Sequence, residues 1–339
     1  MSRSFALPVM LIFISMTLIG CDNSQSTPST LSIDQVEKEE SGWPRSIMTS
    51  KGLLTLEKAP KRIVSTSVTM TGTLLALDAP IVASGATMAN TSVASEQGFM
   101  HQWDNIAISR GITSLYQAEP NAEAIIRAKP DLIIISVTGA DSAIKLYDQL
   151  KDIAPTLVIR YDNKSWMQLA QIFGDLLGLE QQAKTIIEDF QQNINETKSI
   201  ITLPPQPTTA MVYYQDGSAA NIWTNESAQG RLLSDLGFTL ATIPDEIKGD
   251  ISMGVRSDIV IASGELFPDA LTGKSILLFS ANQERETDLK NNSYLNSVEA
   301  IKNEQVFAVG FDTFRLDYYS ASNLLSRLQD LFGQQNNEQ

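Results

Sequence analysis

Residues 121–136 read NAEAIIRAKPDLIIIS, a helical stretch that runs directly into an apolar one. Pro130 ends the helix, because proline disfavours helical geometry at the residue before it. Residues 131–136 then have the unbroken apolar character of a strand that is buried on both faces of a parallel sheet. A helix followed by such a strand is the repeating unit of α/β folds.

The same unit recurs on both sides of a purely helical region. Before that region we expect strands at 62–65, 81–85, 131–136 and 156–159, and helices at 69–77, 121–129 and 141–152. Residues 164–200 keep apolar positions three to four apart and predict only helix, with a break at Gly178. After the region we expect strands at 210–214, 258–263, 275–280 and 305–309, and helices at 227–236 and 318–332. The sequence therefore predicts an α/β protein with two doubly wound α/β lobes joined by a single long rigid helix.

The N-terminus has the pattern of a bacterial lipoprotein signal. Arg3 precedes an apolar run, Phe5–Ile19, which has signal-peptide length and is too short for a comfortable transmembrane helix. The run leads into Gly20 and Cys21, the only cysteine of the chain. We expect cleavage before Cys21 and its acylation. Because Asp22 follows, we expect anchoring on the periplasmic face of the inner membrane; in a Gram-positive cell the same signal would mean the outer face of the only membrane.

These signals divide the chain into six segments. We expect a lipoprotein signal peptide at 1–20, a lipid-anchored flexible tether at 21–42, an N-terminal α/β lobe at 43–163, connecting backbone helices at 164–202, a C-terminal α/β lobe at 203–333 and a disordered tail at 334–339. The tether is rich in Ser, Thr, Gln and Glu, without apolar periodicity.

Composition argues against several classes of function. The formal net charge of −14 is far from that of a nucleic-acid-binding protein. His101 is the only histidine, and the sequence contains no phosphate-binding loop, dinucleotide fingerprint or nucleophile elbow. We therefore expect a protein that is not an enzyme and has no cofactor. The adjacent tyrosines at 213–214 and 318–319 could in principle ligate bare iron, but neighbours on a strand point to opposite faces and neighbours on a helix diverge.

Aromatic and basic residues in the predicted loops are the candidates for ligand binding. They are Trp103, Arg110 and Tyr116 in the first lobe, and Tyr214, Trp223, Phe314 and Arg315 in the second. Arg315 follows the end of the last predicted strand, and ligands of open α/β sheets bind at the carboxyl ends of strands.

The helix and strand at 121–136 resemble the hallmark of the helical-backbone (class III) substrate-binding proteins, which serve importers of siderophores, haem and cobalamin. Four stretches, 62–72, 150–157, 221–230 and 313–321, are more closely similar to the ferric-enterobactin-binding members of that family. The resemblance extends from Trp43 to Phe332. It implies the class III fold and a monomer that delivers its ligand to an inner-membrane ABC permease.

The resemblance also implies a ligand and the residues that hold it. A ferric catecholate siderophore carries three net negative charges on aromatic groups, which suit guanidinium and aromatic side chains. Arg315, Phe314 and Trp223 match the motifs of the ferric-enterobactin binders, and Tyr116 and Arg110 are further candidates. The siderophore itself holds the iron, so no direct metal ligand is expected.

Glu123 matches the position of a glutamate that docks on the permease, and Glu246 or Asp250 would serve in the second lobe. The loop 89–93 lacks a basic residue that the enteric relatives carry there. Haem, cobalamin and hydroxamate siderophores remain alternative cargoes. An envelope-acting hydrolase and a scaffolding lipoprotein are the alternatives from other classes.

Overall fold

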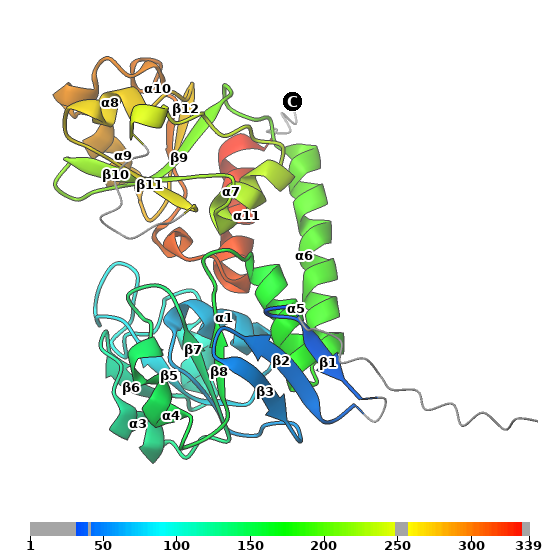
Figure 1. Cartoon of the computed structure of the whole chain (residues 1–339). Coiled ribbons are helices and arrows are strands. Elements are labelled where there is room, and N and C mark those ends of the chain that lie inside the picture. Colours follow the sequence, from blue (N-terminus) through cyan, green and yellow to red (C-terminus); the bar gives the residue numbers. More distant parts are fainter. Residues whose placement is uncertain (1–31, 40–41, 248–256, 334–339) are drawn as a thin grey trace, which may run out of the picture. The chain divides into compact units, whose positions relative to one another are not determined.

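The computed structural model describes residues 32–39, 42–247 and 257–333, all of them in a unit that begins at Leu31 (Figure 1). Cys21, Asp250 and the tail from 334 onward lie outside the described residues. Among the described residues, two five-stranded sheets form the framework of two lobes. The predicted α/β class is confirmed.

The first lobe is built on a sheet whose strands are all parallel, in the order β6-β5-β4-β7-β8. The strands are β4 (Ile63–Ser65), β5 (Ile81–Ala86), β6 (Thr113–Gln117), β7 (Leu132–Ser136) and β8 (Thr156–Ile159). Every residue of β7 is buried. This burial explains why the quoted stretch lacks any polar–apolar alternation: both faces of the strand are covered.

Two of the three helices expected in the first lobe are confirmed, one is wrong, and a further helix at 104–109 was not predicted. The helices of this lobe are α1 (Val68–Ala76), α2 (Asp104–Ser109), α3 (Ala122–Arg127), the 3₁₀ turn η1 (Ile144–Leu146) and α4 (Tyr147–Leu150). The single helix expected at 141–152 is wrong, because only η1 and the one-turn α4 form there. Asp141 and Ser142 instead bond to other segments: Asp141 accepts from Thr69, and Ser142 donates to Ser136.

A small antiparallel sheet precedes the first lobe, in the order β1-β2-β3. Its strands are β1 (Val36–Lys38), β2 (Arg45–Thr49) and β3 (Gly52–Leu56). The prediction of a tether without structure up to residue 42 is therefore wrong for β1. Lys38 of β1 and Arg45 of β2 both form ion pairs with Glu180, at 2.6 and 2.9 Å, which draws this segment onto the start of the connecting helix.

Two helices make the connection between the lobes. α5 (Trp166–Leu177) begins with a capping box at Ser165, and Gly178 ends it in the left-handed conformation with φ of 79°. α6 (Glu180–Ile200) has 21 residues, a length of about 30 Å. It runs beside both lobes (Figure 1), as the predicted long connecting helix requires.

The sheet of the second lobe is mixed, in the order β11-β10-β9-β12-β13. Its strands are β9 (Thr208–Tyr213), β10 (Ala219–Trp223), β11 (Ile259–Ser263), β12 (Ser275–Leu278) and β13 (Val306–Ala308). β10 is antiparallel to both of its neighbours, so this lobe departs from the fully parallel arrangement expected of a doubly wound lobe. A turn with Asp216 and Gly217 joins β9 to β10, and Asp-Gly is a typical hairpin signal.

Helices and 3₁₀ turns cover this second sheet. They are α7 (Ala228–Asp235), η2 (Asp245–Ile247), η3 (Gly264–Leu266), α8 (Phe267–Ala270), α9 (Gln283–Lys290), η4 (Ser293–Leu295), α10 (Glu299–Lys302), η5 (Phe311–Phe314) and α11 (Tyr318–Phe332). α11 has the bounds that the sequence predicts. Asp317 caps it by accepting from the backbone N–H groups of Tyr319 and Ser320.

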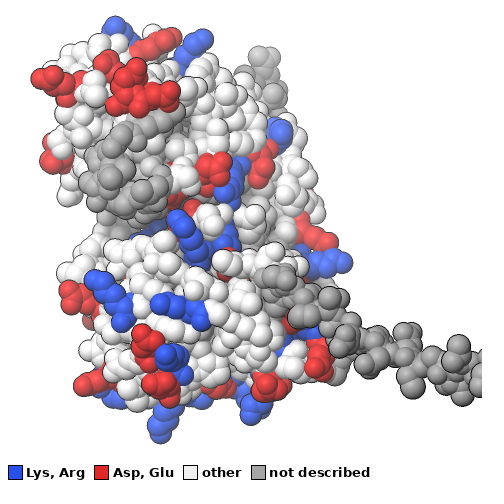
Figure 2. All heavy atoms as spheres, viewed as in Figure 1, with Lys and Arg blue, Asp and Glu red and all other residues white. Residues whose placement is uncertain are grey.

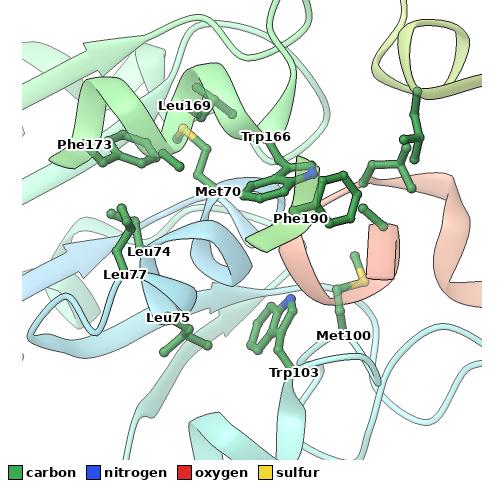
Figure 3. Close-up of a cluster of buried hydrophobic side chains, with 14 of the residues drawn as sticks. Met70, Leu74, Leu75, Leu77, Met100, Trp103, Trp166, Leu169, Phe173 and Phe190 are labelled. Carbon is green, nitrogen blue, oxygen red and sulfur yellow. The ribbon is translucent and has the colours of Figure 1, made fainter. Parts of the chain in front are cut away.

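One hydrophobic core is shared by α1, α5, α6 and α11. Figure 3 shows part of it, with Leu74 of α1 and Leu77, which follows α1, facing Phe173 of α5. In the same view Trp166 lies beside Phe190 of α6. The rings of Trp166 and Phe190 meet edge to face, with 4.9 Å between their centroids. The connecting helices therefore share a continuous core with the first lobe.

Candidate functional site

A cavity of about 300 Å³ lies between the lobes in the described part of the chain. Its first-lobe wall consists of residues that follow β4, β7 and β8. This is the carboxyl edge of a parallel sheet, where α/β proteins bind ligands. Its second-lobe wall comes from β10, the start of β11 and of α7, and the loop before α11. The lining residues with chemical interest are Thr69, Tyr161, Lys164, Trp223, Phe314 and Arg315.

Arg315 extends from the second lobe to the first. It follows η5, and its carbonyl accepts a hydrogen bond from Ser320 Oγ at 2.9 Å. Its Nη1 donates to Asp141 Oδ2 at 3.2 Å, to the Tyr161 hydroxyl at 3.3 Å and to Thr69 Oγ1. The guanidinium is therefore bonded to three groups of the first lobe.

Asp141 is the carboxylate at the centre of this contact. It accepts hydrogen bonds from the hydroxyls of Ser67, Thr69 and Tyr161. Burial acts to raise the pKa of Asp141, but the Arg315 charge and these hydrogen bonds outweigh it and hold the pKa below its usual value. Asp141 is thus ionised at neutral pH.

Phe314 and Trp223 form the aromatic side of the cavity. Their ring centroids are 5.8 Å apart, and the Arg315 guanidinium carbon lies 5.7 Å from the Phe314 centroid. The backbone here is fixed by Gln229 of α7, whose Nε2 donates to the Phe314 carbonyl at 2.7 Å. Trp223 is only 5% exposed, whereas Phe314 is partly exposed, so Phe314 offers the larger ring surface to a ligand and Trp223 packs against it.

The other cations near the cavity are also paired with carboxylates. Arg160 lies 2.7 Å from Asp162, and Lys164 lies 2.7 Å from Asp34. Figure 2 shows basic side chains close to the level at which the lobes meet, and an acidic group on the far end of the second lobe. Within the described ranges, the two cations that line the cavity, Lys164 and Arg315, therefore each have a local counter-charge.

The remaining predicted ligand residues do not line this cavity. Trp103 is 1% exposed and packs on Phe99 in the core, so its prediction as a ligand residue is wrong: the structure leaves it no surface for a ligand. Arg110 forms an ion pair with Asp78 at 2.6 Å and donates to the Leu75 carbonyl, which ties down the end of α1.

Tyr116 and Tyr214 are half-buried and bonded within their own lobes. The Tyr116 hydroxyl donates to the Thr66 carbonyl at 3.1 Å, and burial raises the pKa of Tyr116. The Tyr214 hydroxyl donates to Asn221 at 2.9 Å. Neither residue borders the cavity of about 300 Å³.

Asp141, Tyr161 and Thr69 are the site residues that the sequence analysis missed. Their positions could have identified them as candidates, since each follows a predicted strand of the first lobe. Their polar side chains lie at the same sheet edge as the predicted cleft, although nothing in the local sequence names Arg315 as their partner.

A larger cavity of about 810 Å³ lies between the lobes, where β13, α9 and α11 line it from the second lobe. Ser92, His101 and Gln102 border it from the first lobe, and Arg327 borders it from the second. It shares no lining residue with the smaller cavity. Gln102, which lines the larger cavity, donates to Asp317 at 3.1 Å, so a second side-chain contact joins the two lobes.

Comparison with protein families decides the class of the chain. Residues 63–313 match the family model described as periplasmic binding protein. The chain belongs to the periplasmic binding protein family. Phe314 and Arg315 lie directly after the matched region.

Individual relatives of this periplasmic binding protein bind iron complexes. The ferric enterobactin-binding periplasmic protein FepB of Escherichia coli O6:H1 is 50% identical over 86% of this chain and 91% of its own. The iron(3+)-hydroxamate-binding protein YxeB of Bacillus subtilis is 26% identical over 93% and 91% of the two chains. The crystal structure of holo-ViuP superimposes with a TM-score of 0.79 at 32% identity, covering 86% of this chain and 96% of that one.

The predicted docking acids of this binding protein lie on its surface. Glu123 is on α3 with an 84% exposed side chain, and its carboxylate is 3.8 Å from Arg127. Glu246 is exposed in η2. Within the described ranges, no helix is both long and apolar enough to cross a membrane, and no three potential metal-ligating acids, histidines or cysteines cluster together.

Proposed function

We propose that this periplasmic binding protein captures a ferric catecholate siderophore of the enterobactin type in the cleft between its lobes. It then delivers the complex to an inner-membrane ABC permease. The observation that carries the proposal is the placement of Arg315 and Phe314 together at the edge of the cavity, with Trp223 behind them. The 50% identity with FepB supports the choice of ligand.

The chemistry of these side chains suits a catecholate complex. A guanidinium stays charged and presents several fixed donors to the anionic oxygens around the iron. Phe314 adds a ring face for stacking, and a cation–π contact joins it to Arg315. The iron stays within the siderophore, so the protein needs no metal ligands, no cofactor and no catalytic group.

A hydroxamate siderophore is the main alternative cargo, because the relative YxeB is named as an iron(3+)-hydroxamate-binding protein. A ferric hydroxamate is close to neutral and does not need a guanidinium clamp. The pairing of Arg315 with Phe314 therefore favours the catecholate.

The proposal is tested by titrating the mature soluble protein with ferric enterobactin while tryptophan fluorescence is measured. Iron-free enterobactin, a ferric hydroxamate, ferric citrate, haem and cobalamin serve as controls. Saturable quenching at sub-micromolar ferric catecholate, with little response to the hydroxamate, supports the proposal. A response to another ligand without one to the catecholate would overturn the choice of cargo and keep the transport role.

We propose further that acylated Cys21 anchors the protein to the periplasmic face of the inner membrane. The lipoprotein pattern of residues 1–21 supports this. A Cys21→Ser variant should appear in the soluble fraction after cell disruption, whereas the unmodified protein should sediment with inner membranes. Sedimentation of both forms alike would contradict the anchor.

A further inference from the structure

A carboxylate of the first lobe contacts the guanidinium of Arg315. Arg315 of the second lobe is bonded to Asp141 of the first, although 174 positions separate them in the chain. Only 20% of the Arg315 side chain and 13% of the Asp141 side chain are exposed. Charges so well shielded from water interact strongly, and removal of one partner leaves the other in an unfavourable environment.

Asp141 holds its position without help from Arg315. Ser67 and Thr69, at the start of α1, and Tyr161, after β8, all donate to its carboxylate. These three hydroxyls belong to the first lobe, so the carboxylate stays in place when Arg315 moves. The pair is therefore asymmetric: a fixed anion holds a cation that lies on a loop.

Arg315 differs from Asp141, because its own lobe holds its backbone and not its guanidinium. Ser320 holds its carbonyl, and Gln229 holds the carbonyl of Phe314. Its guanidinium contacts only first-lobe groups among the hydrogen bonds described. An anionic ligand at the cavity must therefore compete with Asp141 for this guanidinium.

Two cations near Arg315 in the described part of the chain do not relieve that competition. Lys164 is engaged by Asp34, and Arg160 by Asp162. The ligand must supply enough negative charge to draw Arg315 from a carboxylate that is already bonded to it.

We infer that Asp141 is a specificity-determining residue that acts as a built-in competitor for Arg315 and rejects ligands of low negative charge. The inference rests on the proposed function and deepens it, because it explains how the site discriminates among iron complexes by charge. A tri-anionic catecholate complex takes the place of the carboxylate at Arg315. A near-neutral hydroxamate complex does not, so it leaves the bond between the lobes intact and gains nothing from the guanidinium.

The test is a double-mutant cycle on the full mature chain, with Asp141→Asn, Arg315→Ala and the combination of both. Affinities are measured for ferric enterobactin, ferric citrate and a ferric hydroxamate. Asp141→Asn should tighten ferric enterobactin binding about tenfold, since it removes both the competitor and a nearby like charge. Hydroxamate affinity should change by less than about twofold, because a near-neutral ligand does not engage these charges.

The cycle separates competition from simple repulsion. If Asp141 acts through Arg315, the gain from Asp141→Asn should be at least about threefold smaller in the Arg315→Ala background. Equal gains in the two backgrounds would mean that Asp141 only repels the ligand, and would overturn the inference. Weaker binding of both ligands by Asp141→Asn would mean a purely structural role, with the same consequence.

A matched control removes the same charge elsewhere on the first lobe. Asp148 is 86% exposed and paired with Lys151, and Asp148→Asn should leave every affinity within about twofold.

If the unmodified protein binds ferric citrate but not the catecholate, the proposed cargo fails, and the cycle is run with ferric citrate. If the protein binds the catecholate but Asp141→Asn does not change the affinity, the competitor role of Asp141 fails and the proposed function stands. If the protein binds only neutral complexes, or no complex at all, both the competitor role and the proposed function fail.

Discussion

Arg315 carries the largest predicted effect of any single residue on ligand binding. Its replacement by Ala removes the charged donors at the cavity and leaves Asp141 without its counter-charge. We expect affinity for ferric enterobactin to fall about tenfold to a hundredfold, which corresponds to about 1.5–3 kcal/mol. The measurement is the fluorescence titration described above.

The control for this variant is Arg315→Lys, which keeps the charge and loses the planar fork of donors. It should bind with intermediate affinity. An unchanged affinity in Arg315→Ala would mean that the ligand sits elsewhere, and the cavity that Ser92 borders would be the next candidate.

Asp317 predicts a pH dependence of stability. It is 2% exposed, and burial raises its pKa to about 6, against the hydrogen bonds from Ser320, Gln102 and Tyr319. The folded protein therefore holds this proton more tightly than the unfolded chain between pH 4 and 6. Its contribution to the free energy of unfolding should fall across that window as pH rises, by a total on the order of 3 kcal/mol.

Many other carboxyls titrate in the same range, so the prediction concerns a difference. The free energy of unfolding by urea is measured for the unmodified protein and for Asp317→Asn, in which the amide oxygen still caps α11. The difference between the two should change from pH 4 to pH 6 and stay constant above pH 7. A difference that is flat throughout would contradict the raised pKa.

At the level of elements, the crossing of α5 and α6 depends on a glycine. A Cβ built on Gly174 would lie 2.6 Å from the Cβ of Ala183, closer than side chains tolerate. We expect Gly174→Val to lower the free energy of unfolding by about 1–3 kcal/mol, because the helices must separate. Gln171→Ala, on the exposed face of the same helix, should change it by less than about 0.5 kcal/mol.

If Gly174→Val and Gln171→Ala changed the free energy of unfolding equally, Gly174 would not be needed for the close packing of α5 and α6. The same crossing shows what local sequence can predict. The apolar spacing of α5 and the glycine that ends it were visible in the sequence, whereas the contact with Ala183 follows from the way the two helices pack.

The second lobe shows a similar limit at the level of strands. β9, β11, β12 and β13 were predicted from their apolar runs, but β10 was not. Its sequence, Ala219–Trp223, mixes small, polar and aromatic residues, yet all five are buried, with Ile222 in one hydrophobic core and Trp223 in another. When the burial of a strand depends on the elements that pack against it, the strand's own sequence need not contain an apolar run.

For the whole molecule, the exposed acids of the two lobes predict how the protein meets its permease. Glu123 on the first lobe and Glu246 on the second are the proposed docking residues. A Glu123→Ala/Glu246→Ala variant should bind ferric enterobactin with unchanged affinity. Its complex with the permease should be about threefold to tenfold weaker, since exposed ion pairs each contribute at most about 1 kcal/mol.

The measurement is ligand-dependent ATP hydrolysis or uptake in proteoliposomes over a range of binding-protein concentrations. Glu188→Ala is the control, because Glu188 is similarly exposed on α6 beside Lys184. A variant that supported uptake at the same concentrations as the unmodified protein would remove these two acids from the docking surface.

The sequence by itself determined the fold class, the long connecting helix, the start and end of α11, and the place of Phe314 and Arg315 after the last strand. These features depend on hydrophobic periodicity, capping residues and turn signals, which act over a few positions. Only the tertiary structure decided that Trp103 belongs to the core, that β1 joins the folded unit, and that Arg315 is held by Asp141. Each of these depends on residues that are distant in the chain, and which charges and rings meet is set by the packing of whole elements against one another.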